Sequence, residues 1–157
     1  MKNFVKIIAV ILIAAISMTF LVSCFKSMKG IEKKIKDLDD DEYTYEKLSS
    51  KEIDAFVDDI EDEYDYEFKG DIKSYYTVIR DFGYRTTTVC ELEKTADAKK
   101  LAEIYEDLLE SIRQKEEESE KTPDVEFGVS VEYKKYVVKR SGTIVVFGHE
   151  DIVNEIW

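Results

Sequence analysis

The residue types that most often carry enzyme chemistry are scarce in this chain of 157 residues, apart from its carboxylates. There is one histidine, His149, and there are two cysteines, Cys24 and Cys90. A histidine that acts as a general base or as a zinc ligand normally works with a partner residue. Because His149 follows Gly148, where a strand is expected to give way to a helix, we expect it to cap that helix.

Cys90 and the acidic clusters also favour structural roles. Cys90 alternates with Leu92 along an expected strand, which predicts a buried, small apolar residue rather than a nucleophile. With 35 Asp and Glu residues, no carboxylate pair stands out as an acid and base. The clusters at 58–59, 61–63 and 116–118 predict solvated helix faces, with weak divalent-cation binding as the alternative.

Cys24 lies in a different context, at the end of an N-terminal targeting segment. Lys2 and Lys6 precede an apolar run, and the run ends in a small residue and a cysteine, the order of a signal peptide. The motif consists of Leu21, Val22, Ser23 and Cys24. It resembles the lipobox of bacterial lipoproteins. That resemblance implies a signal peptide over residues 1–23, diacylglycerol on the Cys24 thiol, an acylated new amino terminus, and a location on the extracytoplasmic face of a bacterial cell membrane.

An uncleaved transmembrane anchor is the alternative for this segment. Residues 7–25 contain no charge over 19 positions, and about 18 apolar residues can span a bilayer. Ser17 and Thr19 lower the hydrophobicity of the second half, which weighs against an anchor. The lysines that follow the run outnumber the two that precede it, which would suit an inverted anchor because positive residues prefer the cytoplasmic side.

For residues 24–48 we predict a lipidated cysteine followed by a basic tether and an acidic linker. Met28, Ile31, Ile35 and Leu38 recur at helical spacing. The lysines around them are Lys26, Lys29, Lys33, Lys34 and Lys36. Such a helix could lie on an anionic bilayer, where each lysine contributes about 1 kcal/mol; alternatively, its lysines only keep a tether soluble. Residues 39–42 are all acidic and indicate a linker.

The net charge of the whole chain is −12, and it is unevenly distributed. From Asp37 onward there are 34 acidic and 16 basic residues, a net charge of −18. Such an acidic domain is unsuited to nucleic acid, because phosphate binding depends on Lys and Arg. We therefore expect no nucleic-acid partner.

Residues 49–157 predict one domain in the order helix, hairpin, helix, hairpin, helix. Ser49 and Glu52 fit a capping box at the start of a helix over 49–64. Strands are expected at 75–79 and 84–92, and a second helix from Thr95 to about residue 118. Residues 125–133 alternate as a strand, a bulge is expected at 134–135, and 143–147 form the last strand before a terminal helix. We expect an α+β fold, with about four antiparallel strands and the helices packed on one face.

Residues 89–92, 95–100 and 136–148 also resemble uncharacterised small lipoproteins of Gram-positive bacteria, a resemblance that implies no site. We expect a membrane-anchored extracytoplasmic lipoprotein that has no cofactor besides its covalent lipid and is not an enzyme. Its partners would be membrane lipid and an unidentified envelope protein. The alternatives are a solute- or divalent-cation-binding lipoprotein and, less favoured, a carboxylate-dependent hydrolase.

Overall fold

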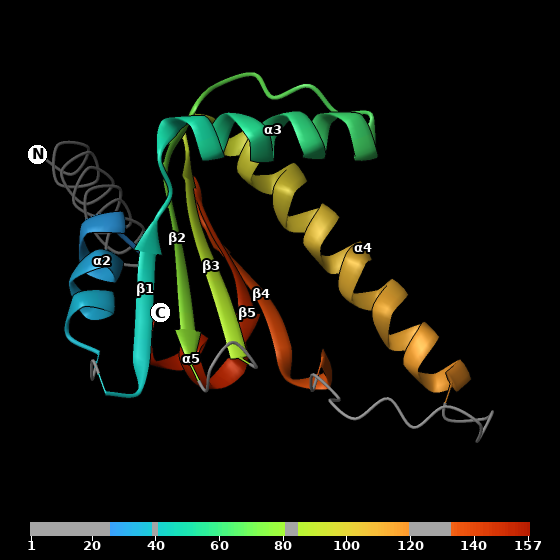
Figure 1. The fold of residues 1–157 in the computed structure, drawn as a ribbon. Helices are drawn as coiled ribbons and strands as arrows, with labels where there is room; N and C mark the ends of the chain where they lie inside the picture. The colour runs from blue at the N-terminus through green and yellow to red at the C-terminus, as the bar shows by residue number, and fades with distance from the viewer. Residues whose placement is uncertain (1–25, 39–40, 81–84, 120–132) are drawn as a thin grey trace, which may run out of the picture.

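The computed structural model describes residues 26–38, 41–80, 85–119 and 133–157, which form an α+β fold (Figure 1). The elements in chain order are α2 (Met28–Lys36), β1 (Tyr43–Lys47), α3 (Ser50–Tyr64), β2 (Ile72–Arg80), β3 (Arg85–Leu92), α4 (Thr95–Ser119), the 3-10 turn η2 (Tyr133–Lys135), β4 (Tyr136–Ser141), β5 (Ile144–His149) and α5 (Glu150–Ile156). The prediction of an α+β fold around an antiparallel sheet is confirmed.

The strands of the described residues form one five-stranded antiparallel sheet in the order β1-β2-β3-β5-β4. Each hairpin joins neighbours, and β3 pairs with β5 in the middle of the sheet, with Val89 opposite Val146. Gly148 lies opposite Thr87, and a Cβ on this glycine would come 2.4 Å from the Cα of Thr87. The central pairing therefore requires glycine at position 148.

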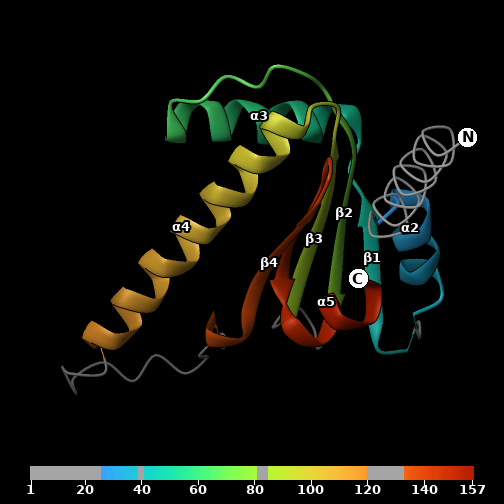
Figure 2. The same ribbon diagram turned by 180° about the vertical axis from the view of Figure 1, so that it is seen from behind.

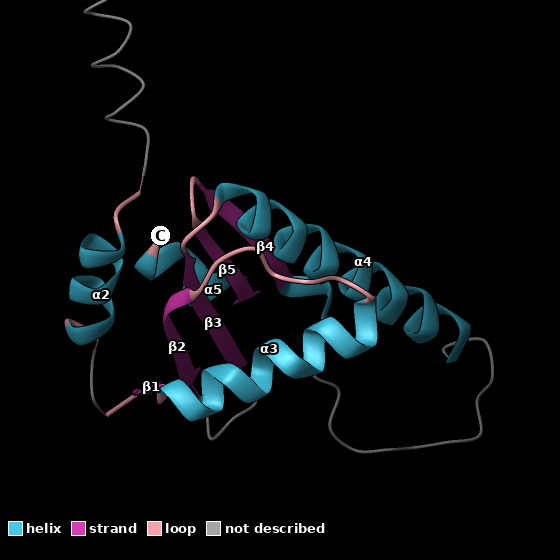
Figure 3. Ribbon diagram, turned by 90° about the horizontal axis from the view of Figure 1, so that it is seen from above, coloured by secondary structure: helices cyan, strands magenta, loops and turns pink. Residues whose placement is uncertain are grey.

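Helices cover both faces of the sheet (Figure 3). On one face, α2 and α5 pack against β-strand side chains that include Val78, Val89 and Val146. On the other face, α4 and α3 pack against side chains that include Tyr75, Leu92 and Val145. Our expectation of helices on one face was wrong. Consecutive residues of a strand point to opposite faces of the sheet. Because Ile144, Val145 and Val146 are all buried, helices must cover both faces.

The strand count and the start of the domain also differ from our expectations. Our predicted order began at residue 49 and contained about four strands, but residues 43–47 form the edge strand β1, paired with β2. Residues 28–36 form α2, whose Met28, Ile31 and Ile35 are buried in the core. Four of the five β1 side chains are exposed, so the strand lacks the apolar pattern that predicts one.

The two long helices follow the sequence signals. Ser49 and Glu52 form the predicted capping box at the start of α3, where the Ser49 N–H donates to the Glu52 carboxylate at 2.7 Å. The predicted stripe of α4 packs on the sheet, with Leu101, Ile104 and Leu109 buried. Figures 1 and 2 show α3 lying across one end of the strands and α4 running obliquely over the sheet.

The second hairpin differs from the expected one. The strand expected at 125–133 lies outside the described residues, except for Tyr133 at its end, which is in η2. Where we expected a bulge, residues 133–135 form a 3-10 turn, and β4 begins at Tyr136. The last strand and the terminal helix are present as β5 and α5.

Candidate functional site

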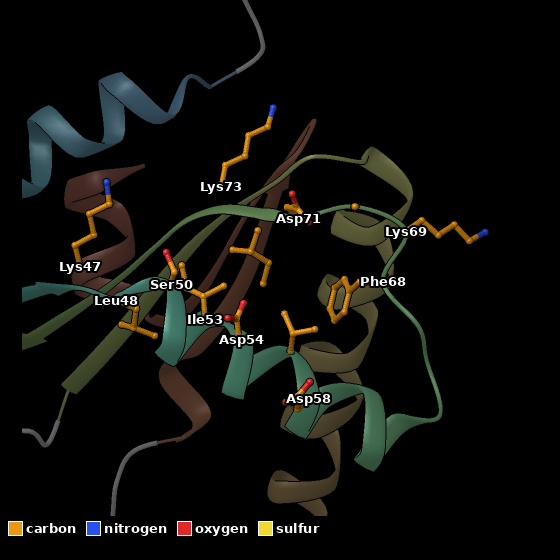
Figure 4. A pocket seen from close by; sticks show the side chains of 13 residues that line it. Lys47, Leu48, Ser50, Ile53, Asp54, Asp58, Phe68, Lys69, Asp71 and Lys73 are labelled. Carbon is orange, nitrogen blue, oxygen red and sulfur yellow. The ribbon is translucent and has the colours of Figure 1, made fainter.

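A groove with a volume of about 870 Å³ lies between α3, the end of β1 and residues 68–73 (Figure 4). Its apolar lining consists of Leu48, Ile53, Val57, Phe68 and Ile72. Its charged lining consists of Asp54, Asp58, Asp71, Lys47, Lys69 and Lys73. The groove therefore combines an apolar surface with charges of both signs.

The first wall of the groove is α3, and its position is set by the hydrogen bonds where β1 ends and α3 begins. The Leu48 N–H donates to the Tyr75 carbonyl at 3.0 Å, the last contact of β1 with β2, and the Ile53 N–H then donates to the Ser49 carbonyl at 3.0 Å. Residues four apart lie on one side of a helix. Ile53 and Val57 therefore line the groove together. Asp54 and Asp58 form the adjacent acidic row (Figure 4).

The second wall is the segment between α3 and β2, which buried Asp97 holds in place. α3 is capped at its C-terminus by Asp65, which has a left-handed backbone with a φ of 48°. The carboxylate of Asp97, which is 0% exposed, accepts from the Tyr66 hydroxyl at 2.7 Å and from the Lys69 N–H at 3.1 Å. Burial and this hydrogen bond raise the pKa of Tyr66 to about 12. Two hydrogen bonds accepted by a wholly buried carboxylate thus fix the second wall.

Two further acceptors complete the second wall. Glu61 of α3 accepts from the Phe68 N–H at 2.7 Å, and the Tyr66 and Phe68 rings meet edge to face with centroids 5.4 Å apart. The Asp71 carbonyl accepts from the Glu93 N–H at 2.8 Å. The segment is therefore connected to α3 as well as to α4. The sequence signal for Asp97, an acidic residue in the first turn of a helix, predicts only a local role.

The two walls of the groove differ in charge: α3 contributes Asp54 and Asp58, whereas the other side contributes three lysines and Asp71. The α3 helix carries seven carboxylates and one lysine, a net charge of −6. Asp54 and Asp58 are exposed, and within the described residues neither makes an ion pair or a side-chain hydrogen bond. Lys47 and Lys73 belong to the ends of β1 and β2, and the Lys47 ammonium lies 5.4 Å from the Tyr76 ring centre.

The lining of this groove contains no His or Cys. The lining offers apolar contact and charged groups of both signs. The thirteen residues that line it come from two helix turns, two strand ends and one fixed segment. Such a surface can bind a ligand that presents an apolar side chain beside charged ones.

The structure confirms the two roles predicted for isolated chemical groups. His149 is 1% exposed and caps α5, where its Nδ1 accepts from the Asp151 N–H at 3.4 Å. Cys90 is 1% exposed and packs in the core on the α4 side, and burial raises the pKa of its thiol. Because the thiolate is the nucleophile, this thiol is unsuited to nucleophilic chemistry.

The acidic clusters of α3 are solvated, as predicted. Asp58, Asp59, Asp62 and Glu63 are exposed, and Glu61 is half-buried. Among the residues that the structure describes, no group of three or more His, Cys, Asp or Glu side chains is arranged to hold a metal ion. The side chains of the predicted cluster at 116–118 lie outside those described.

The apolar stripe of the basic helix, which we expected either on an anionic bilayer surface or in a soluble tether, packs in the core of the domain. Ile31 and Ile35 are 2% and 0% exposed because they pack on the sheet, so this face cannot also contact lipid. The predicted membrane-contact lysines, Lys26, Lys29, Lys33, Lys34 and Lys36, are all exposed. Residues 21–24, including the predicted lipidation site Cys24, lie outside the described residues.

Comparisons with models of protein families, with curated proteins and with solved structures find no match for this chain. In the part of the chain that the structure describes, no helix is both long enough and apolar enough to cross a bilayer.

Proposed function

We propose that this protein is a lipid-anchored, extracytoplasmic binding protein of the bacterial envelope, and that its groove is the surface that binds a partner protein. The observation that carries the binding role is the lining of the groove, in which apolar and charged side chains lie together between two fixed walls. The anchor rests on the sequence Leu21-Val22-Ser23-Cys24, which resembles a lipobox. The proposal involves no catalytic residue.

The position of Lys26 supports a domain that lies directly on the membrane. Its backbone N–H donates to the Ser141 hydroxyl in the β4–β5 hairpin at 3.0 Å, and its ammonium lies 6.0 Å from the Trp157 ring centre. Lys26 is two residues beyond Cys24, a reach of about 7 Å at most. A lipid on Cys24 would therefore hold this end of the domain at the bilayer surface.

The exposed lysines of α2 would add a second membrane signal. The diacylglycerol proposed for Cys24 already carries two acyl chains, which is enough for stable anchoring, so the basic patch would orient the domain on the bilayer. The lysines of α2 face away from the sheet because Met28, Ile31 and Ile35 occupy the buried side. In this proposal they contact anionic lipid headgroups and do not insert into the hydrocarbon.

Metabolic labelling with a fatty acid tests the anchor. In cells that express the full chain, Cys24→Ala should abolish labelling and signal cleavage. Cys90→Ala is the matched control, because it removes the other cysteine from a buried site and should leave labelling intact. Labelling and cleavage that persist in Cys24→Ala would overturn the anchor.

A further inference from the structure

We infer that the groove binds a protein segment that carries two Lys or Arg side chains about 6 Å apart next to a large apolar side chain. The cations would lie against Asp54 and Asp58, and the apolar side chain between Val57 and Phe68. This inference rests on the proposed function, because it names the partner class for the same groove.

The shape of the groove favours a polypeptide segment over a small molecule. Sites for small molecules are concave and bury 70–90% or more of their ligand. This groove instead runs along one side of α3 and is only about half enclosed by its lining. A protein segment that lays one face into a groove and leaves the other in solvent fits this geometry.

The apolar side chains of the lining supply part of the contact area. Ile53, Val57 and Phe68 are all half-buried, although each has a large apolar side chain. Phe68 and Ile72 are held on the second wall by a segment whose backbone is fixed at Lys69 and Glu93. A side chain that enters between Val57 and Phe68 would gain apolar burial, and the walls are already ordered before it binds.

The negative charge of the first wall favours a partner with positively charged side chains. Asp54 and Asp58 are four residues apart on α3, and like charges at this spacing repel each other. Neither side chain is neutralised within the described residues, and the whole helix has a net charge of −6. Cationic side chains placed beside this row would therefore relieve the repulsion as well as form ion pairs.

The spacing of the two carboxylates sets the spacing of the cations. Four residues of α-helix rise about 6 Å. Cations four residues apart on a helix, or two apart on a strand at about 6.6 Å, match it. Lys47 and Lys73 lie away from this row, at the ends of β1 and β2, so acceptors on the partner would face that side (Figure 4).

Binding of designed peptides to the full chain in detergent tests this inference. The probe is a capped helical peptide of Ala and Leu with two lysines four residues apart, and its matched partners carry Gln or Glu at those two positions. We expect the lysine peptide to bind about tenfold more tightly than the Gln peptide, and the Glu peptide more weakly still. Equal binding of the lysine and Gln peptides would overturn the inference.

Paired variants locate the site. Asp54→Asn with Asp58→Asn should weaken binding of the lysine peptide about tenfold, whereas Asp59→Asn with Asp62→Asn changes the charge of α3 equally outside the groove and should not. An equal loss in both pairs would show non-specific attraction and overturn the site. Val57→Ser should weaken binding of both the lysine and the Gln peptides, after circular dichroism confirms folding, and unchanged binding would overturn the apolar contact.

Because detergent replaces the membrane, this experiment does not depend on lipidation. A chain that fails fatty-acid labelling but binds the lysine peptide would refute the anchor and leave the groove assignment standing. A chain that is labelled but binds all three peptides equally would refute the groove assignment alone.

Discussion

Asp97 links the fold of this protein to its candidate site, because one buried carboxylate determines where the second wall of the groove lies. Its two acceptor bonds go to Tyr66 and Lys69, which are 31 and 28 positions away in the sequence. A buried carboxylate is tolerated only when it is hydrogen-bonded in this way. The position of Phe68, between these two donors, follows from the same contacts.

Replacing Asp97 with Ala should destabilise the fold and disturb the groove together. The change removes both bonds and leaves the Tyr66 hydroxyl and the Lys69 N–H without their acceptor, at a cost of about 2–4 kcal/mol in the free energy of unfolding. Urea denaturation measures this loss. Asp107→Ala, at an exposed position of the same helix, is the control and should change the free energy by less than about 0.5 kcal/mol. Equal stability of the two variants would contradict the anchoring role.

At the residue scale, local roles could be predicted from the sequence and distant ones could not. The cap formed by His149 and the burial of Cys90 follow from neighbouring residues and from strand alternation. Asp97 looks like any acidic residue in a first helical turn, because its partners become neighbours only when α3 and α4 come together. The groove was missed for the same reason, since its two walls are separate in the sequence.

At the element scale, α2 and β1 differ most from what the sequence predicted. Basic residues around an apolar stripe are typical of a membrane-surface helix, but the same stripe fits a helix packed on a sheet. The structure has the second arrangement, with Ser27 capping α2 by accepting from the Gly30 N–H at 3.2 Å. Strand β1 was not predicted because its mostly exposed side chains do not alternate between apolar and polar. It is a strand because its backbone pairs with β2.

Truncating Ile35 tests whether α2 belongs to the folded domain. Ile35 is 0% exposed and lies in the core with α5, so Ile35→Ala should lower the free energy of unfolding by about 2–5 kcal/mol. Lys34→Ala, next to it on the exposed side, should change that free energy by less than about 0.5 kcal/mol. Urea denaturation again gives the measurement. A tether outside the domain would give no loss for Ile35→Ala.

The contact between α2 and β2 should make the fold sensitive to alkaline pH. Burial and the Glu32 carboxylate raise the pKa of Tyr76 from its ordinary 10.0 to about 12. Because the folded chain holds this proton more tightly than the unfolded chain, the stabilisation is complete below pH 10 and is lost as the pH rises to about 12.

The variant Tyr76→Phe should therefore show a smaller loss of stability between pH 9.5 and about 11.5 than the unmodified protein. The two values come from urea denaturation at each pH. Tyr45→Phe is the comparison variant because its side chain is 42% exposed, and its decline should be larger than that of Tyr76→Phe. Tyr43 and Tyr66, whose pKa values are also raised to about 12, account for part of the decline that remains. A decline that is unchanged in Tyr76→Phe would refute the contribution of this contact.

At the scale of the whole molecule, the charge is arranged in two opposed regions. The exposed side of α2 is basic, whereas α3 carries a net charge of −6. Figure 3 shows these helices on different faces of the sheet, with α3 at the end of the strands. If α2 faces an anionic bilayer, as we propose, the same bilayer would repel the acidic α3 on the other face of the sheet.

This orientation predicts that the α2 lysines, and not lysines in general, bring the C-terminal end of the domain close to anionic lipid. Trp157 is the only tryptophan and lies against Lys26, so its fluorescence reports this end of the molecule. In vesicles that contain anionic lipid and a dansyl-labelled lipid, the lipidated protein should transfer energy efficiently from Trp157. Transfer should fall in neutral vesicles and in high salt, because screening weakens the attraction.

A triple variant and its matched control separate this effect from net charge. Lys29→Gln, Lys33→Gln and Lys34→Gln together remove three exposed charges from α2 and should reduce energy transfer in anionic vesicles to the level in neutral ones, since each lysine contributes about 1 kcal/mol near such a surface. Lys47→Gln, Lys69→Gln and Lys73→Gln remove the same charge from the groove and should leave transfer high. If the two triple variants lose transfer equally, the domain responds only to its net charge, and the bilayer does not select the α2 face.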